Sequence, residues 1–248
     1  MILALNTSTQ QCSIALLHED GTLVAEQLMP GGKGHFGDLM PALDMLLHTS
    51  RFKQKDIKCL AVATGPGSFT GLRVGLSLAK GFCHALQVPI IGIPSLRAMA
   101  FQLPYTAHPI APILSSRKGE VFTALFLWDK ENRLRQKEKD NCYKLDIFPS
   151  LFTETTLFVG NDYPSQGAVL KGLLGSRARI APPQCWHLKA SSVGALALHR
   201  FNAGDLDDPI TLAPLYFRPP DIRPTIGPVP TASDLQIPKS HTGELPRV

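Results

Sequence analysis

The side chains that most often carry out catalysis are present in this sequence, but their spacing matches none of the common catalytic motifs. The eight histidines form neither an H-x-x-x-H nor an H-E-x-x-H pair, the spacings at which two imidazoles on one helix bind a metal ion. Ser68 follows Gly67, but the second glycine of a G-x-S-x-G nucleophile motif is displaced. Residues 65–71 lead into Leu72 and Arg73, where a Walker A motif needs Lys and then Ser or Thr. We therefore predict no catalytic residue and no bound metal ion.

The glycine-rich stretch at residues 65–71 is the most distinctive motif of the chain. Glycine frees the backbone for tight turning, and the hydroxyl of Ser68 or Thr70 is suited to capping the helix that follows. The N–H groups of such a loop, with the helix dipole behind them, form a phosphate site in many proteins. An ordinary turn from a strand into a helix uses the same residue types. Both interpretations stay open, and the candidate phosphate or nucleotide contacts are Gly65, Gly67 and Ser68.

Two amphipathic helices are predicted on either side of this stretch and its preceding strand. The first carries an apolar stripe at helical spacing, namely Phe36, Leu39, Met40, Leu43, Leu46 and Leu47. The second carries small residues along one face, namely Gly71, Gly75, Ala79 and Cys83. An internal glycine costs a helix about 1 kcal/mol relative to alanine, so two of them indicate that another helix approaches closely. That helix belongs either to this chain or to a partner, and both alternatives stay open.

The order of these elements predicts an α/β protein with two similar halves. The first half has strands at residues 1–6, 13–18, 23–28, 59–63 and 89–93, with helices at 36–47, 71–86 and from about 95. The second half repeats this βββαβα order less clearly, with strands at 110–114, 121–128, 133–139 and 157–160 and helices at 146–152, 163–174 and 190–203. We predict an N-terminal lobe over residues 1–103 and a C-terminal lobe over 104–218. Residues 219–248 are rich in proline and lack periodicity, which indicates a flexible tail.

Composition narrows the functional classes. The formal charge is +5, from 25 Lys and Arg against 20 Asp and Glu, and it is spread along the chain, so direct RNA binding by a basic segment is weakly supported. The five cysteines include no C-x-x-C pair, which suits free thiols in a reducing compartment. No secretory leader or span of about 20 apolar residues is recognisable. We therefore predict a cytoplasmic protein.

Five stretches, in order along residues 1–218, match one known family. They are residues 2–9, 65–75, 89–93, 117–122 and 214–218, and the second is the most specific. On these residues the chain resembles the TsaB (YeaZ) family. The resemblance implies an actin-like ATPase fold built of two ribonuclease-H-like lobes. It also implies a partnership with TsaD, a paralogue that transfers threonylcarbamoyl to the tRNA adenosine beside the anticodon, and with the ATPase TsaE.

The chain departs from the related patterns at positions that matter for chemistry. Ser95 and Met99 stand where the resemblance to TsaD would place its two metal-binding histidines. Asn6 stands where TsaB-like and actin-like proteins commonly carry aspartate, and an amide is a poorer Mg²⁺ ligand than a carboxylate. Ser115 stands where the family usually has aspartate. These departures argue against transfer or ATP hydrolysis by this chain.

The resulting prediction is a non-catalytic scaffold or activator subunit that binds a TsaD-like protein and reaches tRNA through the complex. It forms a homodimer when alone, and any ATP or ADP lies at a partner interface. The predicted partner surface comprises the first two helices, with His35, Phe36, Leu39, Leu43, Leu46, Leu47, Gly71, Leu72, Gly75, Leu76 and Ala79. The alternatives are an actin-like ATPase or small-molecule kinase, and a metal-independent peptidase. Both fit poorly, because acidic Mg²⁺ ligands and a nucleophile motif are missing.

Overall fold

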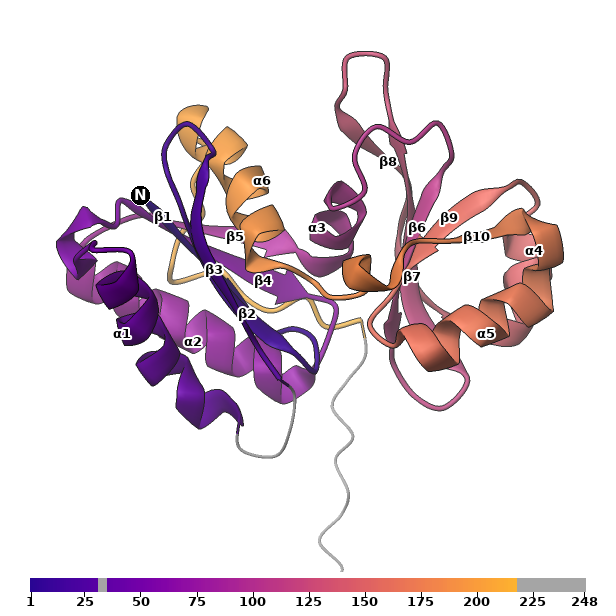
Figure 1. Cartoon of the computed structure of the whole chain (residues 1–248), viewed down its shortest axis with the longest axis horizontal. Coiled ribbons are helices and arrows are strands. Elements are labelled where there is room, and N and C mark those ends of the chain that lie inside the picture. The colour runs from indigo at the N-terminus through magenta and orange to yellow at the C-terminus, as the bar shows by residue number, and fades with distance from the viewer. Residues whose placement is uncertain (31–34, 218–248) are drawn as a thin grey trace, which may run out of the picture. The chain divides into compact units, whose positions relative to one another are not determined.

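The computed structural model describes residues 1–30 and 35–217, with the side chains of His35 and Phe36 left out. The predicted tail at 219–248 lies outside the described residues. The first sheet has the strand order β3-β2-β1-β4-β5 (Figure 1). Its strands are β1 (Ile2–Asn6), β2 (Cys12–Leu17), β3 (Leu23–Met29), β4 (Cys59–Gly65) and β5 (Ile90–Pro94). β1 pairs antiparallel with β2 and parallel with β4, so the hairpin strands lie on one side and the crossover strands on the other.

The second sheet repeats this topology. Its strands are β6 (Ile110–Ser115), β7 (Glu120–Trp128), β8 (Leu134–Lys144), β9 (Thr156–Val159) and β10 (Ala178–Ile180). Their order is β10-β9-β6-β7-β8. When β6 to β10 are renumbered 1 to 5 and the sheet is followed from β8, the order is 3-2-1-4-5, as in the first sheet. The predicted α/β fold with two ribonuclease-H-like halves is confirmed, although sequence analysis missed the short edge strand β10.

Six α-helices and several short 3₁₀ turns connect the strands of the described chain. The α-helices are α1 (Leu39–Thr49), α2 (Phe69–Leu86), α3 (Ser95–Phe101), α4 (Phe148–Leu151), α5 (Tyr163–Leu174) and α6 (Ala190–Asn202). A 3₁₀ turn, His35–Asp38, leads directly into α1. The Ser68 hydroxyl caps α2 by accepting from the Gly71 N–H at 3.2 Å. At the other end, Gln87 adopts a left-handed conformation that stops the helix.

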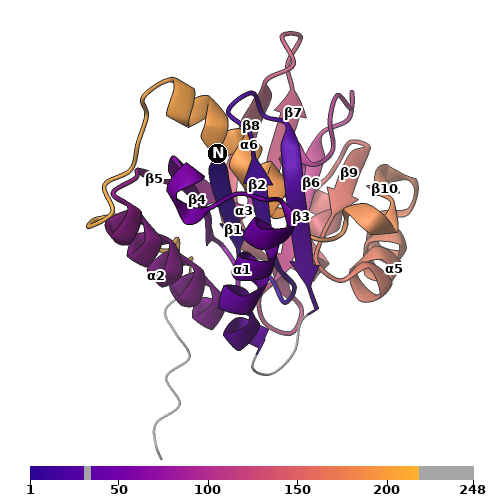
Figure 2. The ribbon, with the colours of Figure 1, turned by 60° about the vertical axis from the view of Figure 1, so that its left-hand side comes forward.

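The alternation of β1 divides the first sheet into two buried faces. Leu3 and Leu5 point into a core formed with α1 and α2, while Ile2 and Ala4 point into a second core that contains α3, α6 and the second sheet. Successive side chains of a strand point to opposite faces, and here both faces are covered. Figure 2 shows α1 and α2 together on one face of the sheet. A central strand that is apolar at every position before Asn6 is the expected result.

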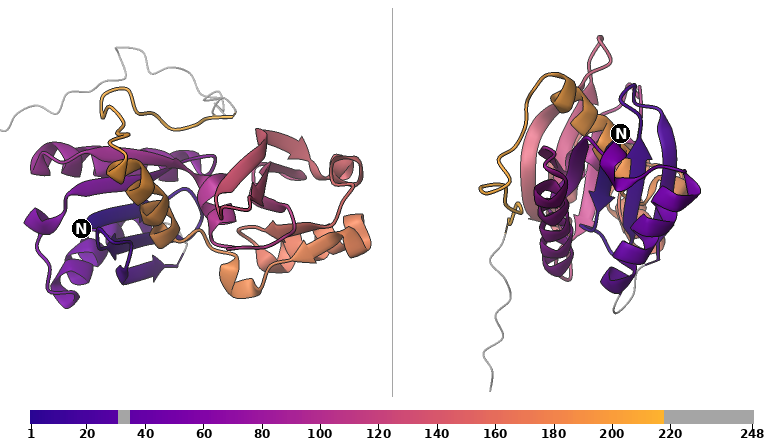
Figure 3. Two further views of the ribbon diagram at one scale, coloured as in Figure 1. Left: turned by 90° about the horizontal axis from the view of Figure 1, so that it is seen from above. Right: turned by 90° about the vertical axis from the view of Figure 1, so that its left-hand side faces the viewer.

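Helix α6 lies against the first sheet, although we placed it in the C-terminal half. It packs on β1, β2, β4 and β5 (Figure 3). At Gly194 an added Cβ would overlap Leu17 and approach Ala4 at 3.1 Å, so only glycine allows this separation of helix and sheet. The chain therefore crosses back to its N-terminal half after α5, and a division at residue 103 does not separate the packing of the two halves.

After α6 the chain runs along the open edge of the first sheet. Asp207 pairs with Ile90 of β5, and its carboxylate accepts from the Gly92 N–H at 2.7 Å. Arg200 of α6 holds Asp207 at 3.0 Å. Further on, the Leu215 N–H donates to the Thr64 carbonyl at 2.8 Å. Residues 205–217, named here the return segment, thus cover an edge that would otherwise leave backbone groups unpaired.

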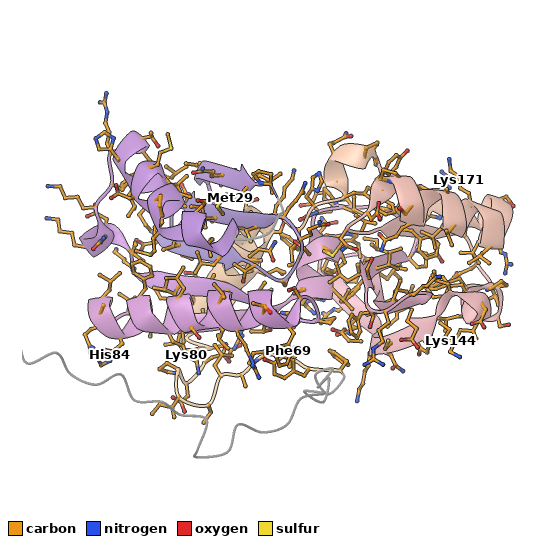
Figure 4. The ribbon with its side chains drawn as sticks, turned by 90° about the horizontal axis from the view of Figure 1, so that it is seen from below. Met29, Phe69, Lys80, His84, Lys144 and Lys171 are labelled. Carbon is orange, nitrogen blue, oxygen red and sulfur yellow. The ribbon has the colours of Figure 1, made fainter. Side chains whose placement is uncertain are left out.

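The return segment also lies along one side of α2. The Lys80 ammonium donates to the Ile210 carbonyl at 3.5 Å, and Arg73 Nε donates to the Tyr216 hydroxyl at 3.1 Å. The ring of Tyr216 packs on Phe69, with centroids 4.8 Å apart. Figure 4 shows Phe69 and Lys80 on the side of α2 that faces this segment. Part of the helix surface is therefore covered by the chain itself, with Arg73 exposed at the margin.

Candidate functional site

Asn6 ends β1, at the position where the resemblance to actin-like proteins led us to expect aspartate. Its side chain is fully buried. The amide Nδ2 donates to the Leu188 carbonyl at 2.9 Å and to Thr9 Oγ1 at 3.2 Å. Oδ1 accepts from Ser8 N–H at 3.0 Å and from the Ser8 hydroxyl at 2.7 Å. Both donors and both lone pairs of the amide are used, so Asn6 ties β1 to the chain before α6 and has no free oxygen for a cation.

The glycine-rich stretch packs against the turn that follows Asn6. The Ser68 N–H donates to the Ser8 carbonyl at 2.7 Å, and the Thr7 hydroxyl donates to the Gly71 carbonyl at 2.7 Å. A Cβ on Gly67 would overlap the Ser8 carbonyl. The stretch is therefore shaped to let two backbone segments touch.

The phosphate prediction for Gly65, Gly67 and Ser68 is not supported by this geometry. Gly65 has φ +116° and takes the backbone into the turn. The amide of Ser68 is already bound to Ser8, and the Ser68 hydroxyl is bound to the Gly71 N–H. A phosphate would have to displace these contacts. The alternative that sequence analysis left open, a strand-to-helix turn, accounts for the residues.

The small-residue face of α2 is also an internal contact, which corrects the predicted partner surface. Gly71, Gly75 and Ala79 are buried, and so are Leu72 and Leu76. A Cβ on Gly71 would overlap the Thr7 carbonyl, and one on Gly75 would overlap the Thr7 hydroxyl. What approaches the helix is therefore the end of β1, not a helix of a partner. These five residues cannot form an exposed interface.

The apolar stripe of α1 belongs to the same core and requires the same correction. Leu39, Leu43, Leu46 and Leu47 are only 2–5% exposed and pack with Leu3, Leu5, Ile14 and Leu16. The apolar stripe of α1 therefore covers the first sheet of this same chain and is not available to a partner. The predicted surface also included His35 and Phe36, whose side chains lie outside the described part of the structure.

The outer sides of the two helices remain exposed. On α1, Met40 and Met45 are 49% and 60% exposed. On α2, Arg73 and Ser77 are exposed, with Leu78 half-buried between the helix surface and the core. We name these five residues the outer face. Sequence analysis singled out the buried stripe, because helical periodicity marks apolar residues without saying whether they meet a sheet or a partner. Met45, which lies off that stripe, was the available signal, whereas Met40 belongs to the predicted stripe itself.

The position that would carry the metal pair is closed. Met99 is fully buried, and Ser95 is fully buried with its hydroxyl unpaired among the described residues. Within residues 1–30 and 35–217, no group of three or more His, Cys, Asp or Glu side chains is placed to hold a metal ion. None of the helices in this part is long and apolar enough to cross a bilayer.

A polar cavity of about 290 Å³ lies beside the Asn6 turn. It is lined by Thr9, Gln10, Gln11, Pro30, Asn161, Trp186 and His187. Burial, and then the charge of Lys189, lowers the pKa of His187 below its ordinary value, so that the imidazole is neutral at pH 7. The described lining therefore contains amides, a hydroxyl and a neutral imidazole but no carboxylate. Such a lining is poorly suited to Mg²⁺ and a triphosphate.

On the second lobe, Ser115 lies in a hydrogen-bonded group of neutral side chains. Its N–H donates to Asn161 Oδ1 at 3.1 Å, and its hydroxyl accepts from Gln166 Nε2 at 3.0 Å. Gln166 Oε1 in turn accepts from the N–H groups of Asn161 and Asp162. Ser115 thus fastens the end of β6 to the start of α5, a structural task that does not need the family's aspartate.

Comparison with known proteins gives a consistent picture. Residues 30–166 match the family model for TsaD, tRNA N6-adenosine threonylcarbamoyltransferase. The chain is 34% identical over 182 residues to the tRNA threonylcarbamoyladenosine biosynthesis protein TsaB of Bacillus subtilis, which covers 72% of this chain and 79% of that protein. It is 27% identical over 242 residues to TsaB of Haemophilus influenzae, which covers 88% and 93%.

Solved structures agree on the fold. YeaZ from Pseudomonas aeruginosa superimposes with a TM-score of 0.71 at 22% identity, over 87% of this chain and 98% of that one. An ADPNP-bound activator of 2-hydroxyisocaproyl-CoA dehydratase from Clostridium difficile superimposes with a TM-score of 0.50 at 11% identity, over 82% and 96%. The fold is that of the actin-like ATPases, as the resemblance implied. With the sequence matches above, these observations establish that the chain belongs to the TsaB family.

Proposed function

We propose that this chain acts in the biosynthesis of threonylcarbamoyladenosine in tRNA, as a non-catalytic subunit that binds and supports a TsaD-like transferase. The relatives from Bacillus subtilis and Haemophilus influenzae carry the name of this biosynthesis. The match of residues 30–166 to the TsaD family model fits a chain that is a paralogue of its own partner. One similar structure from Pseudomonas aeruginosa is named for its similarity to a peptidase, but the described residues offer no nucleophile motif to support that activity.

The observation that carries the non-catalytic role is the saturated amide of Asn6. An actin-like enzyme needs an oxygen at this place for Mg²⁺, and here both lone pairs of Oδ1 accept from Ser8. Asn6 Nδ2 also donates to the Leu188 carbonyl, beside the bond that this carbonyl accepts from the Ser13 hydroxyl, and an ionised aspartate would have no N–H for that contact. The family position has therefore changed from metal chemistry to holding two halves of the chain together.

The proposed partner surface is the outer face of α1 and α2. Met40 and Met45 are flexible, polarisable side chains of the kind that suits a protein interface. Their helix, α1, packs with α2 in the core on one face of the first sheet. A TsaD-like subunit covers this face in the complex, and a second copy of this chain covers it when the partner is absent. The complex also includes a TsaE-like ATPase, contacts tRNA, holds any ATP or ADP at a subunit interface and acts in the cytoplasm.

Co-purification of the full chain with its TsaD-like protein tests this proposal. Met45→Glu should weaken the complex at least tenfold, because it places a charge in an apolar contact. Val169→Glu is the matched control, since Val169 is 43% exposed on α5, away from the outer face. The same mixtures should form threonylcarbamoyladenosine on tRNA only when both proteins are present. If the Met45→Glu variant binds the TsaD-like protein as tightly as the wild type, the interface does not include the outer face. If this chain alone modifies tRNA, the non-catalytic role is refuted.

A further inference from the structure

The fold gathers basic side chains that are far apart in the sequence around one cavity of about 450 Å³. Among the described residues, four arginines and a histidine line it and no acidic residue does, the basic residues being Arg97, Arg133, Arg135, His199 and Arg200. They come from α3, from the β7–β8 hairpin and from α6. These three elements approach one another only in the folded chain (Figure 1). A cavity of this volume is in the range of small-molecule sites.

Three of the four arginines already form ion pairs with carboxylates of this chain. Asp129 accepts from Arg133 at 3.1 Å and from Arg135 at 2.8 Å, so that one carboxylate serves two guanidinium groups. Arg133 has a second partner in Glu131 at 2.9 Å. Arg200 is held by Asp205 and Asp207. Hydrogen bonds within the chain use all five N–H groups of Arg200, whereas Arg133 and Arg135 keep N–H groups that have no acceptor among the described residues.

Arg97 differs from the other three. It is half-buried on α3, and its one hydrogen bond among the described residues runs from Nη2 to the Leu134 carbonyl at 3.1 Å. A guanidinium has five N–H donors, so four remain. Burial, and then the nearby charge of Arg135, lowers the pKa of Arg97, yet a guanidinium stays charged at neutral pH. If the hydrogen bond to the Leu134 carbonyl were the only task of this residue, one donor would be enough. A neutral side chain would provide that donor without the free-energy cost of burying a charge.

The lining of the cavity also contains aromatic side chains. Phe101 and Trp128 both line it, with ring centroids 5.7 Å apart. Trp128 is held in place by a hydrogen bond from Nε1 to the Leu103 carbonyl at 2.8 Å and by the ring of Tyr105 at 5.4 Å. Fixed aromatic side chains of this kind stack on the flat face of a nucleobase.

We propose that this cavity binds a nucleotide unit, with its phosphate on Arg97 and Arg135 and its base against Trp128 and Phe101. The planar guanidinium fork matches the oxygens of a phosphate and binds it through paired hydrogen bonds. The unit is either a free mononucleotide or part of an RNA strand, since both present a phosphate next to a ring. The cavity is separate from the outer face, because α6 and α3 pack on the other face of the first sheet from α1 and α2.

Isothermal titration of the full chain at low salt tests the proposal with three probes: AMP, inorganic phosphate and a short single-stranded RNA. AMP or the RNA should bind measurably, and inorganic phosphate at least tenfold more weakly. Binding of AMP alone assigns a free nucleotide, binding of the RNA alone assigns a strand, and both support the site. Failure of AMP and RNA at millimolar concentration overturns it, as does phosphate binding as tightly as AMP.

Variants locate the binding. Arg97→Met keeps the aliphatic stem and should weaken AMP or RNA about 10- to 100-fold, as expected when a charged donor pair is lost. Arg179→Met is the matched control, because Arg179 is exposed on β10 and outside the cavity. Trp128→Leu should weaken AMP but not inorganic phosphate. If Arg97→Met fails to fold by circular dichroism, Arg135→Met takes its place, because Arg135 is 57% exposed. If the wild type and the folded cavity variants bind AMP and RNA with equal affinity, the assignment is overturned. That outcome is independent of whether the chain binds a TsaD-like protein.

Discussion

Replacing Gly71 by alanine tests whether the small-residue face of α2 is an internal contact of this chain. The added methyl group would overlap the Thr7 carbonyl. That oxygen is backbone and cannot rotate away, and the Thr7 hydroxyl is itself bound to the Gly71 carbonyl at 2.7 Å. The helix and the end of β1 must therefore separate. Gly81 offers the matched control on the same helix, since a Cβ there meets nothing within 4 Å.

The expected change in the free energy of unfolding of Gly71→Ala is the sum of two losses and one gain. Overpacking at a close contact costs about 1–3 kcal/mol, and a lost or stretched Thr7–Gly71 hydrogen bond costs about 1 kcal/mol. The gain in helix propensity from glycine to alanine returns at most about 1 kcal/mol. Gly71→Ala should therefore lower the free energy of unfolding by about 2 kcal/mol, while Gly81→Ala should raise it by about 0.5–1 kcal/mol.

Thermal and urea unfolding followed by circular dichroism measure both effects. For a chain of this size, 1 kcal/mol corresponds to about 2–4 °C in Tm, so Gly71→Ala should melt about 4–8 °C below the wild type. Gly81→Ala should melt slightly above it. If the two alanine variants shift Tm in the same direction by the same amount, the close contact with Thr7 is absent. In that case the small-residue face of α2 would again be available to a partner.

Three further predictions concern the core and the titratable groups. Leu43→Ala should lower the free energy of unfolding by about 2–5 kcal/mol, measured in urea; a cost below about 1 kcal/mol would mean that Leu43 is not in the core. The lowered pKa of His187 means that the unfolded chain binds its proton first, so stability should fall as pH decreases from 7 through about 6.5. His187→Gln should flatten that fall, and an unchanged melting profile between pH 7 and 5 would contradict the assignment. Burial raises the pKa of Cys12 to about 11 and of Cys59 to about 12, so mass spectrometry should find both unlabelled by iodoacetamide at pH 8 until the chain is unfolded.

Local patterns in the sequence were sufficient for most of the elements. The apolar runs of β1 and β4 and the helical stripe of α1 depend on period and length alone. The cap at Ser68 depends on one hydroxyl before a helix. The absence of catalytic motifs depends on spacing, which needs no three-dimensional information. These features are properties of short segments, and for that reason they and most of the strand and helix order of the two halves could be predicted.

The contacts between distant segments were decided only by the tertiary structure. Leu39 and Leu43 are apolar in any environment, and only the placement of the first sheet shows that they face it. Gly71 needs a close neighbour, but the sequence does not say that this neighbour is Thr7. Helix α6 returns to the first sheet, where Gly194 packs closely against Leu17, a contact across most of the chain. Helical and strand periodicity report that a side chain is buried, and they carry no information on which surface buries it.

The charge of the chain shows the same limit. The net charge of +5 is spread along the sequence, which by itself gives only weak support to direct RNA binding. Folding brings Arg97 of α3 and Arg135 of β8 to one cavity, and Arg200 of α6 lines it as well. Electrostatic interaction depends on distance in space and on burial, and neither quantity is encoded in the local sequence around any one arginine. The family and the absence of a catalytic motif could therefore be read from the residues, while the position of a cationic cavity required the fold.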